Sequence, residues 1–245
     1  KTQLHYSYIS NVNRITGPDE GSQPANYHGA THALNGKVDL GQFGAMTGFA
    51  YLLDFENAPA HEVLRAKLAE FEDRLSSCDV VILSDYGKGG LTHIAEMIRL
   101  ARAAGKPVLV DPKGDEWGKY AGATVITPNR SELREVVGRW TSEEDLAERV
   151  RKLRGELGLE ALLVTRSEEG MTLFAADEAH HQPARAREVF DVSGAGDTVI
   201  ATLAVMLAAG AGWAEAIRTA NVAAGIVVGK LGTAVVTREE LAAAL

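Results

Sequence analysis

The chain has little cysteine, no long uncharged run and no basic cluster. Its single cysteine, Cys78, cannot close an intramolecular disulfide, which favours a reducing compartment, the cytoplasm. The longest uncharged run, residues 198–214, has 17 residues and contains Thr, Gly and Trp, so it is too short and too mixed to span a bilayer. Residues 1–25 lack an apolar segment after a basic start, so no secretory signal is visible. We therefore expect no membrane partner.

Charge and motif content exclude further classes of protein. The 245 residues include 25 Lys and Arg against 33 Asp and Glu, a net charge of −8, which makes nucleic acid an unsuitable partner. No Gly-Lys pair is followed by Ser or Thr, so a Walker A loop is absent, and no GxGxxG follows an apolar strand. No Cys and His spacing fits a zinc site, and we interpret His180 and His181 as part of a solvated turn.

From residue 79 onward, short apolar runs alternate with amphipathic stretches. Apolar strands separated by helices predict a sheet covered on both faces, with parallel strands joined by right-handed crossovers. The sequence thus predicts a three-layer α/β/α fold with a mostly parallel central sheet. The expected strands are residues 79–84, 107–111, 123–127 and 161–165, with edge strands at 171–174 and 188–190. The expected helices are residues 91–104, 130–137, 142–157, 196–209 and 213–228, and one from about Arg238.

Residues 191–197 (DVSGAGD) stand directly before an apolar helical run. This places Gly194, Ala195 and Gly196 at a helix N-terminus, where free N–H groups and the helix dipole favour an anion such as a phosphate. Asp197 falls in the first turn, where the same dipole favours its ionised form and where it could take a proton from an attacking hydroxyl. The alternative is a tight turn with an acidic residue at a helix start and no further role.

With Thr198 after it, this segment resembles the signature DxxGAGD of the ribokinase-like (PfkB) family of sugar kinases. Other motifs follow in the family's order. Residues 129–132 (NRSE) match N-x-x-E, which in such kinases organises magnesium and the nucleotide phosphates. Residues 165–170 (TRSEEG) match the strand and turn under the nucleotide, and residues 221–225 (NVAAG) the helix beside the adenine. The resemblance implies a ribokinase-like fold that uses ATP and Mg²⁺.

Within the family, residues 54–245 are most similar to the heptose 7-phosphate kinase domain of the bifunctional heptose kinase/adenylyltransferase proteins. The similar segments are SDYGKG (84–89), DPKG (111–114), TPN (127–129), TRSEEGM (165–171) and VGKLGT (228–233). This resemblance implies transfer of the γ-phosphate of ATP to the anomeric hydroxyl of D-glycero-β-D-manno-heptose 7-phosphate, which gives the 1,7-bisphosphate, in lipopolysaccharide core assembly. It also implies a homodimer, and an adenylyltransferase domain outside these residues.

Roles follow for the candidate residues. Asp197 is expected to be the base, the N–H groups of Gly194, Ala195 and Gly196 to stabilise transition-state charge, and Glu132 to organise Mg²⁺, unless it is only a solvated helix charge. The expected nucleotide contacts are Asn129, Arg130, Ser131, Glu132, Thr165, Ser167, Glu168, Gly170, Asn221 and Gly225. The expected substrate contacts are Asp85, Lys88, Lys113 and Asp191. Both lysines follow strand ends, where α/β folds bind ligands, although surface lysines are common; Asp85 could instead cap the following turn.

The first 53 residues depart from the family, which there carries an Asp-bearing strand, a Gly-Gly…Asn sugar-binding segment and a small β lid. Aligning residues 29–33 (GATHA) with the sugar-binding segment puts His28 and His32 at its first Gly and its Asn, and His5 near the substrate-binding Asp. We therefore interpret residues 1–53 as an atypical segment with a reduced lid, and residues 54–245 as the catalytic core. Three explanations stay open: another specificity, an incomplete N-terminal sequence, or a weakly active module that binds nucleotide or sugar phosphate. A kinase for another phosphosugar, such as fructose 1-phosphate, is a further alternative.

Overall fold

The structure is a computed structural model that describes residues 4–6, 36–38, 61–87, 90–176, 178–185, 190–232 and 234–245. Strands β1 (Leu4–Tyr6) and β2 (Gly36–Val38) pair antiparallel as a two-stranded sheet, so His5 lies in β1. The other expectations for the first 53 residues, including those for His28 and His32, fall outside the described residues, and so does Lys88.

Six strands form the central sheet, in the order β3-β4-β5-β6-β7-β8. The first four are parallel: β3 (Val81–Ser84), β4 (Val108–Asp111), β5 (Val125–Ile126) and β6 (Ala161–Thr165). The last two, β7 (Met171–Ala175) and β8 (Glu178–Gln182), run antiparallel because short turns, not helices, connect them to the strand before. The expected mostly parallel sheet is confirmed.

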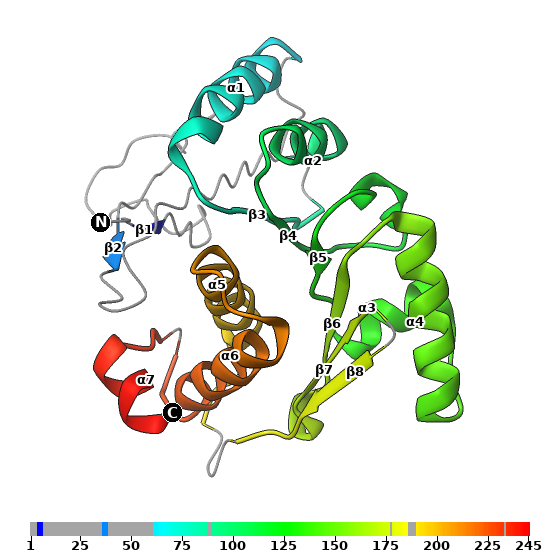
Figure 1. Cartoon of the computed structure of the whole chain (residues 1–245), viewed down its shortest axis with the longest axis vertical. Coiled ribbons are helices and arrows are strands. Elements are labelled where there is room, and N and C mark those ends of the chain that lie inside the picture. The colour runs from blue at the N-terminus through cyan, green and yellow to red at the C-terminus, as the bar shows by residue number, and fades with distance from the viewer. Residues whose placement is uncertain are drawn as a thin grey trace, which may run out of the picture.

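Helices cover both faces of this sheet (Figure 1). One face carries α1 (His61–Arg74), α2 (Ile94–Ala103), α3 (Arg130–Val137) and α4 (Glu143–Leu157). The other face carries α5 (Ala195–Ala208) and α6 (Trp213–Val228), and α7 (Arg238–Ala244) packs against α6. The 3₁₀ turns are η3 (Leu75–Ser77), η4 (Trp117–Tyr120) and η5 (Ser167–Glu169).

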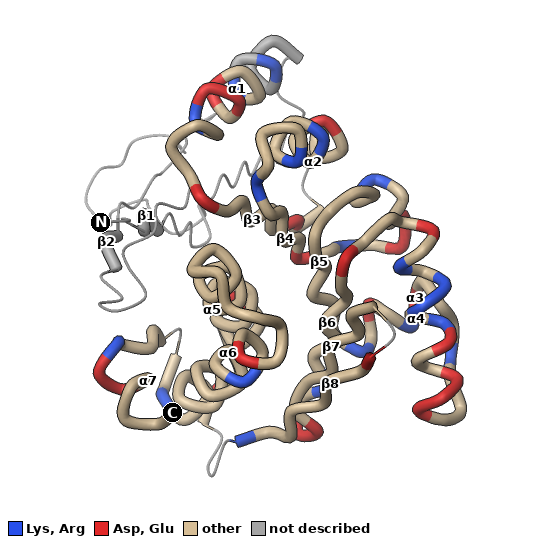
Figure 2. The backbone as a smooth tube through the Cα atoms, viewed as in Figure 1, with Lys and Arg blue, Asp and Glu red and all other residues tan. Residues whose placement is uncertain are grey.

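Alternate strand residues enter the two halves of the core. Val110 and Val164 pack among α2, α3 and α4, whereas Leu109 and Leu163 pack against α5 and α6. Figure 2 shows the consequence for charge: Lys, Arg, Asp and Glu are frequent on α1, α2 and α4, while α5 and α6 are almost free of them. The three-layer α/β/α arrangement is therefore the one that the sequence predicts.

Two local expectations differ from the structure. His180 and His181 lie in strand β8, so the predicted turn is wrong, whereas the expected solvation holds, because His181 is exposed and His180 half-buried. The error arises because β8 is an edge strand whose residues are mostly exposed and polar, so it lacks the apolar alternation that marks a half-buried strand. A strand over 188–190 is not observed at Phe190, which lies in a bend, and residues 186–189 fall outside the described part. Within the described residues, no helix has the length and apolarity needed to cross a membrane.

Candidate active site

Helix α5 packs against strands β3 and β4 and begins at the Gly-Ala-Gly turn. Gly194 is the N-cap, with φ +80°, a left-handed conformation that glycine adopts without strain. Thr198 fastens the turn, because its N–H and its hydroxyl both donate to the Gly194 carbonyl, at 2.9 and 2.8 Å. The predicted helix start is confirmed.

The free backbone donors at this helix start differ slightly from those expected. The N–H of Ala195 donates to the Val192 carbonyl at 3.2 Å, so it closes the turn. The N–H groups of Gly194, Gly196 and Asp197 have no backbone acceptor in the described part of the chain. These three donors, together with the helix dipole, make the start of α5 suited to an anion.

Asp197 is the third residue of α5 and is half-buried. Burial raises the pKa of its carboxyl above the ordinary value of 3.8. Burial, which removes water from the carboxylate, thus acts against the ionised form that the helix dipole is expected to favour. A carboxylate with a raised pKa is a stronger base, which suits proton abstraction from a hydroxyl.

Asp111 ends strand β4 and is a site residue that the sequence analysis did not select. Burial, together with the negative charges of Glu132 and Asp197, raises the pKa of its carboxyl to about 7, against the opposing effects of Lys113 and the Ser84 hydroxyl. Glu132, which lies 3.2 Å from the Lys113 ammonium, and Asp197 are thus near enough for their charges to act on Asp111 at the carboxyl edge of the sheet. The place of Asp111 at a strand end, next to Lys113, was the signal available in the sequence.

We expect Asp111→Asn to stabilise the fold at pH 8 and to change it little near pH 4. Because the native pKa of about 7 lies above the ordinary 3.8, the native state binds a proton more tightly than the unfolded chain. The contribution of Asp111 is therefore most favourable below pH 3.8 and is lost as the pH rises through about 7. Urea unfolding at both pH values measures the difference, with Asp115→Asn, an exposed carboxylate of the same loop, as control. An equal effect at both pH values would contradict this expectation.

Asn129 and Glu132 form a capping box at the start of α3. The Asn129 side chain accepts from the N–H groups of Ser131 and Glu132 at 2.9 and 3.0 Å, and Glu132 accepts from the Asn129 N–H at 3.0 Å. The second carboxylate oxygen of Glu132 lies 3.2 Å from the Lys113 ammonium. Both residues of the N-x-x-E motif thus have a structural role, which neither expectation for Glu132 included.

The described residues contain no group of three His, Cys, Asp or Glu side chains that could hold a metal ion alone. Magnesium nevertheless needs only one or two protein carboxylates when phosphates and water supply the other oxygens. Glu132 and Asp111 offer such oxygens at the edge where Asp197 also lies. The donor chemistry therefore fits this ion.

The turn after β6 is held by Arg166, which the sequence analysis also did not select. Its buried guanidinium donates to both carboxylate oxygens of Glu143, at 2.8 and 2.6 Å, and pairs with Glu169 at 2.8 Å. Glu169 also pairs with Arg130 at the start of α3. These ion pairs join the turn to α3 and α4, so Ser167 and the exposed Glu168 are presented by a rigid segment.

Backbone geometry further restricts this turn. Ser167 has φ +54° and Gly170 has φ +89°. A Cβ on Gly170 would lie 2.1 Å from the Gln182 carbonyl oxygen, so only glycine fits. The Thr165 N–H donates to the Pro128 carbonyl at 2.9 Å, and Thr165 forms a parallel bridge with Asn129. The structure thus brings the two expected nucleotide segments side by side.

Two residues that were expected to contact ligands also make structural hydrogen bonds. The amide of Asn221, buried in α6, donates to the Pro183 carbonyl at 2.8 Å and fastens α6 to the chain after β8; Gly225 lies one turn further along α6, half-buried. Asp191 accepts from the Ser193 N–H at 2.8 Å, and this bond holds the pKa of the Asp191 carboxyl below its ordinary value. Asp191 therefore shapes the turn before α5.

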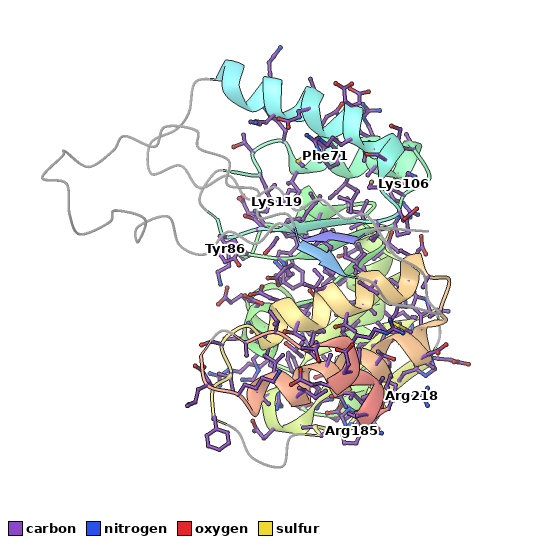
Figure 3. All side chains as sticks on the ribbon, turned by 90° about the vertical axis from the view of Figure 1, so that its left-hand side faces the viewer. Phe71, Tyr86, Lys106, Lys119, Arg185 and Arg218 are labelled. Carbon is purple, nitrogen blue, oxygen red and sulfur yellow. The ribbon has the colours of Figure 1, made fainter. Side chains whose placement is uncertain are left out.

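Asp85 is fully engaged within the protein. Its carboxylate accepts from the Gly87 N–H at 2.8 Å, from the Tyr120 hydroxyl at 2.7 Å and from the Lys119 ammonium at 2.7 Å. The alternative in which Asp85 caps the following turn matches the Gly87 contact. Figure 3 shows Tyr86 and Lys119 at the same side of the sheet, opposite Lys106, which precedes β4.

Known proteins resemble this chain over most of its length. A family model described as pfkB family carbohydrate kinase matches residues 53–240. D-beta-D-heptose 7-phosphate kinase of Bordetella bronchiseptica is 57% identical over 190 residues, which cover 78% of this chain and 61% of that protein. Bifunctional protein HldE of Aeromonas salmonicida is 58% identical over 195 residues, covering 79% of this chain and 41% of that protein.

A solved structure agrees in fold. Arabidopsis thaliana ribokinase, complexed with ribose and ATP, matches with a TM-score of 0.65 and 24% identity over 71% of this chain and 58% of that chain. The chain spans 61% or less of the length of the two curated relatives above.

Proposed function

Because this chain belongs to the pfkB family of carbohydrate kinases, we propose that it transfers the γ-phosphate of ATP to the anomeric hydroxyl of D-glycero-β-D-manno-heptose 7-phosphate. The product is the 1,7-bisphosphate. The relatives at 57 and 58% identity support this choice of sugar. The observation that carries the chemistry is one helix start, where free N–H groups and the half-buried Asp197 lie within a single turn.

Each part of the helix start has a role in this reaction. The N–H groups of Gly194, Gly196 and Asp197 hold the phosphoryl group and stabilise the charge that develops on its oxygens, and one such donor contributes about 3 kcal/mol. The Asp197 carboxylate accepts the proton of the anomeric hydroxyl as that oxygen attacks the γ-phosphorus. Burial assists this step because it makes the carboxylate more basic.

Glu132 and Asp111 would hold Mg²⁺ through their carboxylate oxygens. When bound, the ion neutralises charge on the nucleotide phosphates. The turn at residues 165–170, the start of α3 and the α6 segment at Asn221 and Gly225 would hold ATP, and Lys88 and Lys113 would pair with phosphate oxygens. Asp85 and Asp191 support the site through the turns that they cap.

The organisation of the chain belongs to the same proposal. Residues 54–245 form the catalytic core, and residues 1–53 retain parts of the lid and sugar-binding region. We propose that the protein acts as a homodimer and that an adenylyltransferase domain lies outside these residues. The name of the second relative, a bifunctional protein, supports a second activity. Size measurement by light scattering tests the dimer.

An assay of ADP production tests the function. We expect turnover with ATP, Mg²⁺ and heptose 7-phosphate to exceed turnover with fructose 1-phosphate or ribose by at least about 10²-fold in kcat/KM, because the altered sugar would leave polar groups of the site without partners. Higher kcat/KM with fructose 1-phosphate would contradict the choice of sugar. ATP binding without turnover of any sugar would indicate a weakly active binding module instead.

A further inference from the structure

Two loops at the carboxyl edge of the sheet are joined by a chain of hydrogen bonds through Tyr120. The Lys113 N–H donates to the Tyr120 hydroxyl at 2.9 Å, and the hydroxyl lies 2.7 Å from an Asp85 carboxylate oxygen. We name this chain, Lys113 N–H to Tyr120 hydroxyl to Asp85 carboxylate, the Tyr120 relay. It links the loop after β3 to the loop after β4, which are 28 residues apart between Asp85 and Lys113.

The direction of each bond in the relay is fixed by proton count. A tyrosine hydroxyl has one hydrogen, and the Asp85 carboxylate at 2.7 Å is a nearer and charged acceptor, whereas the Lys113 carbonyl lies at 3.1 Å. The hydroxyl therefore donates to Asp85 and accepts from Lys113. Tyr120 is 0% exposed, so water cannot replace either bond.

Asp85 anchors the relay in its ionised form. Burial alone would raise the pKa of its carboxyl, but the bonds from Lys119, Tyr120 and Gly87 together hold that pKa below its ordinary value. A buried and charged acceptor makes the bond from Tyr120 stronger than one between neutral groups. The relay is thus a rigid support. Losing the hydroxyl would leave the Lys113 N–H without its acceptor, and would leave Lys119 as the remaining partner of one Asp85 oxygen.

The relay determines where the Lys113 side chain starts. A Cβ on Gly87 would lie 3.5 Å from Cγ of Lys113, so the two loops are in close contact there. From this point the Lys113 ammonium extends to 3.2 Å from Glu132, and its charge lowers the pKa of Asp111. Lys113 therefore places a cation beside Glu132 and Asp111, and a small shift of its backbone would move that charge.

We propose that Tyr120 is a positioning residue that acts through Lys113 to hold a phosphoryl oxygen of a bound substrate. This inference rests on the proposed function, which brings phosphates to this edge. A site whose carboxylates already repel one another needs a fixed cation to accept a further anion. The phosphate could belong to ATP or to the phosphosugar, and separate KM values for the two substrates distinguish these sources.

The test compares Tyr120→Phe with Thr124→Val. Thr124 is buried at the opposite, amino edge of the sheet, where its hydroxyl accepts from the Val108 N–H at 2.8 Å and from Arg102 at 2.9 Å, so its loss also removes a buried hydroxyl that holds two partners. We expect Tyr120→Phe to raise KM for one substrate about 10-fold, through loss of a hydrogen bond to a charged group, and Thr124→Val to leave both KM values unchanged.

A double-mutant cycle with Lys113→Ala separates positioning from a merely structural effect. If Tyr120 acts through Lys113, adding Tyr120→Phe to a protein that already carries Lys113→Ala changes KM by less than about two-fold. The substrate whose KM rises then identifies the phosphate. Should Tyr120→Phe fail to fold, Asp85→Asn, which alters the other end of the relay, replaces it in the same cycle.

Three results would overturn the inference. The first is a Tyr120→Phe protein with wild-type kinetics, and the second is a change in KM that Thr124→Val produces equally. The third is a change in KM on Tyr120→Phe that is as large with Lys113→Ala present as without it. Absence of turnover in the wild type would reject the proposed function alone. Calorimetric affinities of the same variants for ATP and for heptose 7-phosphate then decide the positioning role, since binding needs no turnover. A loss of affinity that depends on Lys113 supports it, and unchanged affinities for both ligands reject it.

Discussion

Replacing Asp197 with asparagine is expected to lower kcat at least about 100-fold while leaving the affinity for ATP within a few-fold of the wild type. Asparagine has nearly the same shape but cannot accept the proton of the sugar hydroxyl. Its N–H group and the rest of the α5 N-terminus remain, so phosphate binding should persist. Single-turnover kinetics and calorimetry measure the two effects separately.

Because burial raises the pKa of Asp197, the wild-type activity should begin to fall at a higher pH, as the pH is lowered, than it would with a carboxyl of ordinary pKa.

A matched control is available on the neighbouring helix. Glu215 is exposed in the first turn of α6 and occupies the third helical position, as Asp197 does in α5. Glu215→Gln removes the same charge from an equivalent helix start away from the reacting groups and should leave kcat unchanged. An Asp197→Asn protein with near-wild-type turnover would show that the base is another group.

Replacing Gly170 with alanine is expected to lower the free energy of unfolding by about 3 kcal/mol or more. Two causes add. The residue has φ +89°, which strains any residue with a Cβ, and the new Cβ would lie 2.1 Å from the Gln182 carbonyl oxygen and 2.6 Å from the Ala184 nitrogen. Both neighbours are backbone atoms of β8 and the segment after it, so no side-chain rotation relieves the clash. Urea denaturation measures the loss.

Gly155→Ala provides the comparison, because it is the same substitution at an exposed position in the last turn of α4. Nothing lies within 4 Å of its added Cβ, and alanine favours a helix over glycine, so we expect stability to rise by about 1 kcal/mol. If Gly170→Ala also left the stability unchanged or raised it, the described packing of the turn against β8 would be incorrect.

The elements of the fold that follow one clear periodicity were predicted closely. Helix α6 and strand β6 have the predicted bounds, and so does α3, because apolar residues on one face or in one run leave few alternatives. Ser142 is the N-cap of α4, as expected from a serine followed by three acidic residues. Edge strand β8 was missed because a strand defined by pairing with β7 need not carry an apolar pattern of its own.

The turn at the start of α5 was also predicted, because glycines directly before an apolar helical run indicate a helix start without reference to distant residues. The raised pKa of Asp197 could not be predicted, because it depends on the burial that other elements impose. The same holds for Tyr120 and Arg166, whose partners Asp85 and Glu143 lie 35 and 23 residues away. A single sequence gives the types of these residues but not which of them meet, so a hydrogen-bond chain between loops becomes visible only in the folded chain.

The central claim is that the start of α5 holds the phosphoryl group while Asp197 deprotonates the sugar. A crystal structure of the protein with a non-hydrolysable ATP analogue, Mg²⁺ and heptose 7-phosphate tests it most directly. We expect the terminal phosphate oxygens within hydrogen-bond distance, about 3 Å, of the Gly196 and Asp197 N–H groups, and the anomeric hydroxyl equally close to the Asp197 carboxylate. A terminal phosphate bound elsewhere on the sheet edge, out of reach of that helix start, would contradict the proposal.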